Sequence, residues 1–313
     1  METTIKIIRR SIHTFLLHYN FFTCAAILAL PFSASILLLS SSLLPDFLSF
    51  HSHLRSLFDA AGFPPESEFF TILNLKLSQT ISSSILVLPF SLSFLLIAKS
   101  FVIRSLNDHH KPPPSLAGIF NSVLQTQIWN TLLIISANAT CFWVLFIAFN
   151  FLEKLHIPSL LFTISGGIAY SIVVANALII SNLALILSGM ELSGGFISIL
   201  KACVLIRGRT SIVLSLSLPV NMALAGIEFL FQFRIIKTYS DSGVIKPTST
   251  MILEGLFIAY LYSILITIDA IIGCVFFKSC KIVYDRNLGD QETGRIKEDD
   301  EVALVKCLAK DLF

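Results

Sequence analysis

The chain alternates between long apolar runs and short polar segments. A bilayer's hydrocarbon layer is about 30 Å thick, and a helix needs about 20 apolar residues to cross it. Six runs reach that length: residues 21–44, 80–103, 128–152, 158–189, 211–233 and 251–277. Inside the layer each backbone polar group must be bonded within its own segment, so we expect all six runs to be helical. The pattern therefore predicts an all-α membrane protein, a bundle of six transmembrane helices.

Between the runs, apolar residues recur at helical spacing opposite polar ones. Near the N-terminus this stripe consists of Ile5, Ile8, Ile12 and Phe15. A second stripe occupies residues 116–128, where Ser115 is placed to cap a helix. A third occupies residues 193–207 and includes Phe196, Leu200, Cys203 and Val204. Helices of this kind lie in the headgroup plane, so we predict three transmembrane hairpins joined by cytosolic amphipathic elbow helices.

A short internal repeat supports a transmembrane role for the first run. Residues 27–38 read ILALPFSASILL, and residues 85–96 read ILVLPFSLSFLL. A signal peptide has an apolar region of only about 7 to 15 residues, shorter than this first run. The first run is therefore expected to remain in the protein as a span, like the second.

Composition agrees with lipid as the main solvent. Charged residues make up 13% of the chain, whereas soluble domains carry about 25%. The expected organisation is an amphipathic N-terminal helix in residues 1–20, one membrane domain in residues 21–277, and a flexible cytosolic tail in residues 278–313. The net charge of +2 gives no reason to expect a nucleic acid as partner.

The distribution of basic residues predicts the topology. If the N-terminus is cytosolic, the inner segments carry sixteen Lys and Arg residues and the outer loops carry six. Basic residues close to a span resist translocation. Both termini are therefore expected in the cytosol, with the protein in the plasma membrane or the endomembrane system.

Three acidic residues fall within the runs, where a charge costs about 3 kcal/mol on insertion scales. Glu228 and Glu254 lie near outer ends and can pair with Arg234 or Lys237. Asp269 lies deeper, about 12 Å from the inner end of its run. Lys99 is the basic residue at a comparable depth. Asp269 is thus a neutral or paired structural residue, a proton or cation site, or a sign that the span boundary lies elsewhere.

Uncharged polar and small residues also fall within the runs. The asparagines of interest are Asn138, Asn176 and Asn182. A face of small residues on the fourth run consists of Ser165, Gly166, Gly167 and Ser171. Small residues allow helices to approach, and amides form hydrogen bonds between them. The two interpretations are adhesion between helices and a polar path for transport.

Motifs for catalysis or metal binding are not evident. No HExxH, GxSxG or P-loop sequence occurs, and the six cysteines show no CxxC spacing. We therefore expect no enzyme activity, no cofactor and no metal site. Cys280 lies between Lys278 and Lys281 at the membrane edge, where it is either a lipidation site or an unmodified thiol.

Residues 170–211 combine an apolar run, a short amphipathic segment and a corner of glycine and basic residues before the next run. The pattern is carried by Gly195, Ser198, Ala202, Leu205, Arg207, Gly208 and Arg209. In this pattern the chain resembles a family of plant multi-pass membrane proteins of unknown function. It is also loosely similar to bacterial membrane domains, some of them attached to glycerophosphodiester phosphodiesterases. The resemblance implies no known activity and carries over no catalytic residues.

Together these features predict a non-enzymatic multi-pass membrane protein that has a structural or organising role or binds partners. Its expected partners are the lipid bilayer, further copies of itself and other membrane proteins. The alternative is a transporter or channel for a small solute or ion that uses Asp269 and the span asparagines. A lipid-metabolising enzyme is a third possibility, but it would need catalytic groups that the sequence does not show.

Overall fold

The computed structural model describes residues 2–40, 56, 87–107, 115–153, 159–207, 210–237 and 249–292. Within these residues the regular structure is helical. Six helices in this described part of the chain are long and apolar enough to cross a membrane: Tyr19–Leu38, Val87–Leu106, Leu116–Leu145, Ile164–Glu191, Thr210–Ile236 and Ser249–Lys281. The prediction of six helices of spanning length is confirmed.

The helices begin and end as follows: α1 Glu2–Leu17, α2 Tyr19–Ser40, η1 Ser91–Leu95, α5 Leu96–Leu106, α6 Leu116–Glu153, α7 Ser159–Glu191, α8 Phe196–Ile206, α9 Thr210–Phe231, η2 Gln232–Ile236 and α11 Ser249–Glu292. Both η elements are π-helical. The helix α11 continues past residue 277 to Glu292, so the expected start of a flexible tail at residue 278 is wrong. Residues 293–313 lie outside the described part of the chain.

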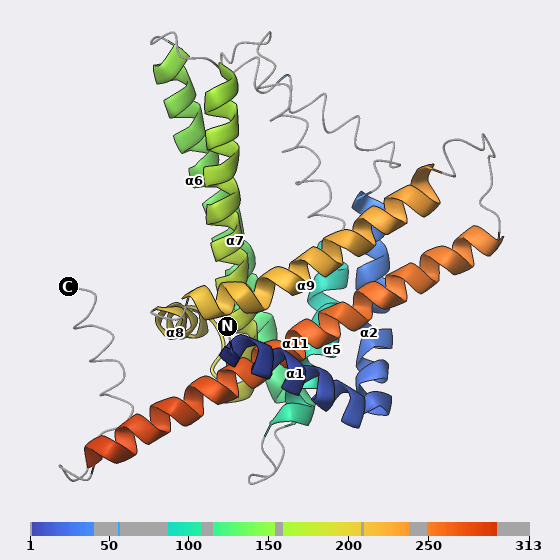
Figure 1. Ribbon diagram of the computed structural model, residues 1–313, viewed down its shortest axis with the longest axis vertical. Helices are drawn as coiled ribbons and strands as arrows, with labels where there is room; N and C mark the ends of the chain where they lie inside the picture. Colours follow the sequence, from blue (N-terminus) through green and yellow to red (C-terminus); the bar gives the residue numbers. More distant parts are fainter. Residues whose placement is uncertain are drawn as a thin grey trace.

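The helix α11 is the centre of the bundle, because α1, α2, α5, α7 and α9 all pack against it (Figure 1). Its buried residues extend from Ile258 to Cys280. The ends of α5 and α7, the starts of α6 and α9, and both α1 and α8 gather along the C-terminal half of α11. We call this the inner end of the bundle, because the basic residues predict that it faces the cytosol.

The two copies of the internal repeat lie side by side, since α2 packs against η1 and α5. Phe32 and Leu37 of the first copy share a buried cluster with Leu95 of the second. In the second copy, the π-helical turn follows Pro89, and the Ser93 hydroxyl donates to the Pro89 carbonyl over 2.6 Å. A proline ring disturbs the helix around it, and π-turns accommodate such local distortion.

The long helix α6 corrects the prediction of an elbow before the third span. Ser115 caps it as predicted, because its hydroxyl accepts a bond from the Gly118 N–H at 3.2 Å. Residues 116–128 then continue without a break into the span and do not form a separate helix. No proline interrupts α6 after this cap, so nothing in its sequence ends the helix at the membrane edge.

The helix α8 is a separate element, and two glycines shape the turn that leads to it from α7. A Cβ on Gly194 would lie 3.0 Å from the backbone oxygen of Ser122 in α6. Gly195 has a φ of +88°, a conformation that side chains disfavour. Its N–H donates to the Thr126 hydroxyl of α6 over 2.9 Å. The glycines therefore hold α8 closely against α6.

The helix α1 packs on the bundle through a face that differs from the predicted stripe. Phe15 is buried, but Ile5 and Ile12 are 65% and 44% exposed. Thr4 and Ser11 are buried in their place. Small side chains allow α1 to lie close to its neighbours, and the Ser11 hydroxyl is satisfied by the Ile7 carbonyl of the same helix at 2.9 Å. Ile5 and Ile12 thus stay exposed on the side away from the bundle, and the expectation that this stripe lies in the headgroup plane stays a prediction.

Candidate functional site

Three polar side chains from three spans meet near the inner end of the bundle. Asn182 of α7 lies between Lys99 of α5 and Asp269 of α11. The Lys99 Nζ donates to the Asn182 Oδ1 over 2.6 Å. The Asn182 Nδ2 in turn donates to the Asp269 Oδ2 over 2.5 Å. One amide thus connects a cation and an anion, because its oxygen accepts from the ammonium group and its NH2 group donates to the carboxylate.

The burial of this polar triad, Lys99, Asn182 and Asp269, is uneven. Lys99 is only 7% exposed, whereas Asn182 and Asp269 are half-buried. Removing an ion from water costs several kcal/mol unless opposite charge and hydrogen bonds compensate for it. The triad supplies both, because the Asp269 carboxylate balances the Lys99 ammonium through the amide. The arrangement joins α5, α7 and α11 in one polar contact.

The other two acids in the spans are also bonded. Glu254 accepts a bond from the Arg234 Nε over 2.7 Å, which is one of the pairings expected from the sequence. Glu228 accepts a bond from the hydroxyl of Tyr262 over 3.0 Å, so it is bonded to neither Arg234 nor Lys237. No feature of the sequence indicates the bond between Tyr262 and Glu228, because it depends on which faces of α9 and α11 meet.

The remaining asparagines have different roles. Asn138 of α6 accepts a bond from the Tyr170 hydroxyl of α7 over 2.7 Å. Asn176 donates to the Ile172 carbonyl of its own helix over 3.0 Å, so it does not join two helices. An asparagine outside the expected site residues, Asn130, is 1% exposed and donates to the Ser181 carbonyl over 2.8 Å. Amides therefore join α6 to α7 at two levels in the middle of α6, at Asn130 and at Asn138.

The residues around α8 are divided between core and surface. Ser198 and Ala202 are buried, Leu205 is half-buried, and Arg207 is exposed. The Ser198 hydroxyl donates to the Ser193 carbonyl and so closes the turn before α8. Gly208 and Arg209 lie outside the described residues.

The burial of Cys280 argues against its lipidation. Its side chain is 3% exposed and packs in the core cluster that contains Ile272 and Phe276. An acyl group could not reach this thiol without opening the bundle.

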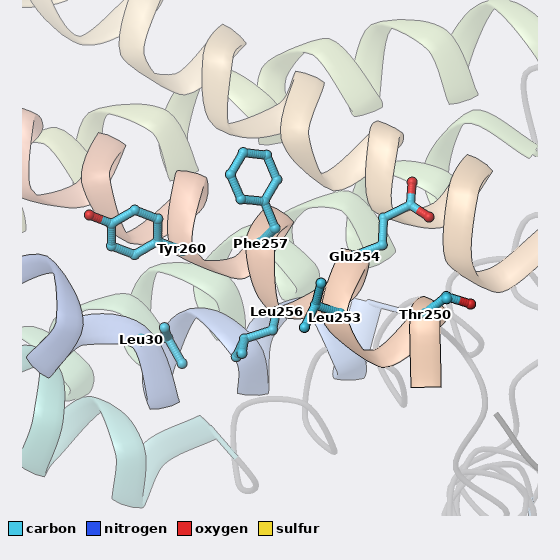
Figure 2. A pocket seen from close by; sticks show the side chains of 7 residues that line it. All are labelled: Leu30, Thr250, Leu253, Glu254, Leu256, Phe257 and Tyr260. Atoms are coloured by element: carbon cyan, nitrogen blue, oxygen red, sulfur yellow. The ribbon is translucent and has the colours of Figure 1, made fainter. Parts of the chain in front are cut away.

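A shallow groove lies near the opposite end of α11. Figure 2 shows the side chains that line it: Leu30, Thr250, Leu253, Glu254, Leu256, Phe257 and Tyr260. The lining is mainly apolar and does not include the polar triad. No group of three or more His, Cys, Asp or Glu residues that could hold a metal occurs in the described part of the chain.

One family model matches the sequence, that of a domain of unknown function, DUF8558, over residues 115–293. The match covers more than half of the chain. The protein belongs to the DUF8558 family. The DUF8558 region contains α6 to α11, and therefore Asn182 and Asp269, whereas Lys99 precedes it. No curated protein and no solved structure matches the chain. The resemblance to plant and bacterial membrane proteins stays a prediction.

Proposed function

We propose that this protein is a non-enzymatic multi-pass membrane protein that organises its surroundings by packing against membrane partners and lipids. Both ends of the membrane domain face the cytosol, in the plasma membrane or an endomembrane. The observation that carries the proposal is that Glu228, Glu254 and Asp269 are each bonded to a side chain of another helix. The intramembrane polar groups therefore serve to hold helices together.

The surface for partners is the outer part of the α6–α7 hairpin. This part projects away from the other helices in Figure 1 (green). Gly166 faces α6, where a Cβ would lie 3.0 Å from Leu145, but a Cβ on the neighbouring Gly167 would contact nothing. The exposed bond between Asn138 and Tyr170 lies on the same hairpin. Small residues and polar groups of this kind favour contact with another transmembrane helix.

Blocking this surface should remove partners without disturbing the fold. We expect Gly167→Leu to reduce severalfold the membrane proteins, or tagged second copies, that co-purify from native membranes. Gly226→Leu on α9 is the matched control, because a Cβ there also meets open space. Co-purification followed by protein identification would measure the effect. An identical set of partners for the wild type and both variants would contradict the proposal.

A second function, transport of a proton or small cation, draws support from the half-buried Asn182 and Asp269. Two buried hydroxyls adjacent to the triad in sequence, Ser100 and Ser181, also have no hydrogen-bond partner among the described residues. If this function holds, proteoliposomes should show a proton or cation flux that Asp269→Asn abolishes. The organising function predicts no flux in either sample.

A further inference from the structure

The helix α1 has a buried face and a broad exposed face. Thr4, Ser11 and Phe15 are buried against the bundle. The exposed face carries a strip of apolar side chains, namely Ile5, Ile12 and Leu16. Arg9 follows Ile5 by four residues and therefore lies along this strip, whereas Arg10 lies about 100° further around the helix. Both arginines are exposed and form no ion pair with any residue that the structure describes. Exposed apolar residues combined with basic ones are typical of a helix at a membrane surface.

The position of α1 is fixed by its neighbours. It lies across the C-terminal half of α11 (Figure 1, dark blue). Ile7 and Ile8 of α1 pack against the core cluster that contains Ile199 and Ala202 of α8. Both helices are therefore attached to the inner end of the bundle, and α1 cannot turn its exposed faces inward without losing this packing.

The exposed residues of α6 indicate where the membrane boundary lies along the bundle. Its exposed residues are polar at Asn121 and Gln125 and then become apolar at Ile128, Trp129 and Leu132. Tryptophan is enriched at membrane interfaces. The Trp129 ring lies 5.9 Å from the ring of Phe196, the first residue of α8. The helix α8 thus lies at this boundary, and α1 lies at the same end of the bundle.

The inner end is strongly basic. Among the described residues beyond α1, the exposed cations at this end are Arg104, Arg207 and Lys281. The acid Glu191 is already bonded to Lys201 over 2.8 Å. Guanidinium groups form paired hydrogen bonds with phosphate oxygens, and anionic lipids attract basic segments near the membrane surface. The charge of this surface therefore complements anionic lipid.

We propose that Arg9 and Arg10 of α1 bind the phosphates of anionic phospholipids in the inner leaflet, while Ile5, Ile12 and Leu16 contact the acyl chains. This inference rests on the proposed function, because it names the lipid class that the organising protein gathers. The bundle fixes the orientation of α1, so the two arginines face lipid headgroups without a folding step upon binding.

Native mass spectrometry of the full chain tests the proposal. The protein is purified in micelles with equal amounts of phosphatidylcholine and phosphatidylglycerol, and bound lipids of each class are counted. We expect the wild type to retain phosphatidylglycerol preferentially. The double variant Arg9→Gln/Arg10→Gln should lower the ratio of bound phosphatidylglycerol to phosphatidylcholine by roughly fivefold for each arginine. Lys237→Gln is the control, because Lys237 is an exposed cation near the opposite end of the bundle.

Salt provides a second measurement that does not depend on a variant. The wild-type preference should weaken as ionic strength rises, because salt screens exposed charges. An unchanged lipid ratio in the double variant, an equal decrease with Lys237→Gln, or a preference that is insensitive to salt would overturn the proposal. Failure of the organising function would appear separately, as unchanged partners in Gly167→Leu membranes, because lipid counting uses the purified chain alone.

Discussion

Replacing Asp269 with asparagine is expected to destabilise the purified bundle by about 3 kcal/mol. Removing one partner of a buried ion pair leaves the other charge uncompensated, which typically costs 3–5 kcal/mol. We expect the lower end of that range, because the site is open on one side: Asp269 is only half-buried, although Lys99, which keeps its charge, is 7% exposed. The amide of the new residue can still accept the bond from Asn182, so the change removes mainly the charge. Thermal unfolding in a mild detergent would measure the loss.

A double-variant cycle separates this charge effect from a loss of packing. Lys99→Met/Asp269→Asn should be less destabilising than the sum of its two single changes, because no unbalanced charge remains. Glu254→Gln is the surface control. Its partner Arg234 is largely exposed, and exposed pairs contribute about 1 kcal/mol or less. If Asp269→Asn costs no more than Glu254→Gln, the triad does not stabilise the bundle.

The number and approximate position of the spans could be predicted because bilayer thickness sets a length that the sequence must meet. Their ends could not be predicted as well. Hydropathy indicates where lipid begins, but it does not indicate whether a helix stops there. Residues 116–128 continue into α6, and residues 278–292 continue α11, because no proline ends either helix at the boundary.

The triad was only partly predictable from the sequence, because it depends on how each helix is rotated about its own axis. Comparing depths identified Lys99 as a possible partner for Asp269, because depth follows from counting residues along a span. The position of Asn182 between them depends on how α7 is rotated about its axis. A span that is apolar on every side does not show in its sequence which face packs against other helices and which faces lipid. The bond of Tyr262 to Glu228 was missed for the same reason.

The asparagines show this most clearly. Asn176 and Asn182 are six residues apart on α7, which places them on different faces of the helix. From sequence the two were equivalent candidates for bonds between helices. In the structure Asn182 joins two charged groups on neighbouring helices, whereas the amide of Asn176 returns to its own backbone. The difference lies in the surroundings rather than in the residue type.

That difference predicts contrasting effects for the same substitution at the two sites. Asn182→Leu should destabilise the bundle by about 3 kcal/mol or more, because it removes one hydrogen bond from each of two charged groups, and each such bond contributes about 1.5–3 kcal/mol. Asn176→Leu should change stability by about 0.5 kcal/mol or less, since it removes only an exposed bond within one helix. Thermal unfolding of both variants in the same detergent tests this directly. An equal loss of stability in the two variants would mean that the bulk of leucine, and not the loss of hydrogen bonds, causes the effect. In that case the bridge between Lys99 and Asp269 does not hold the three spans together.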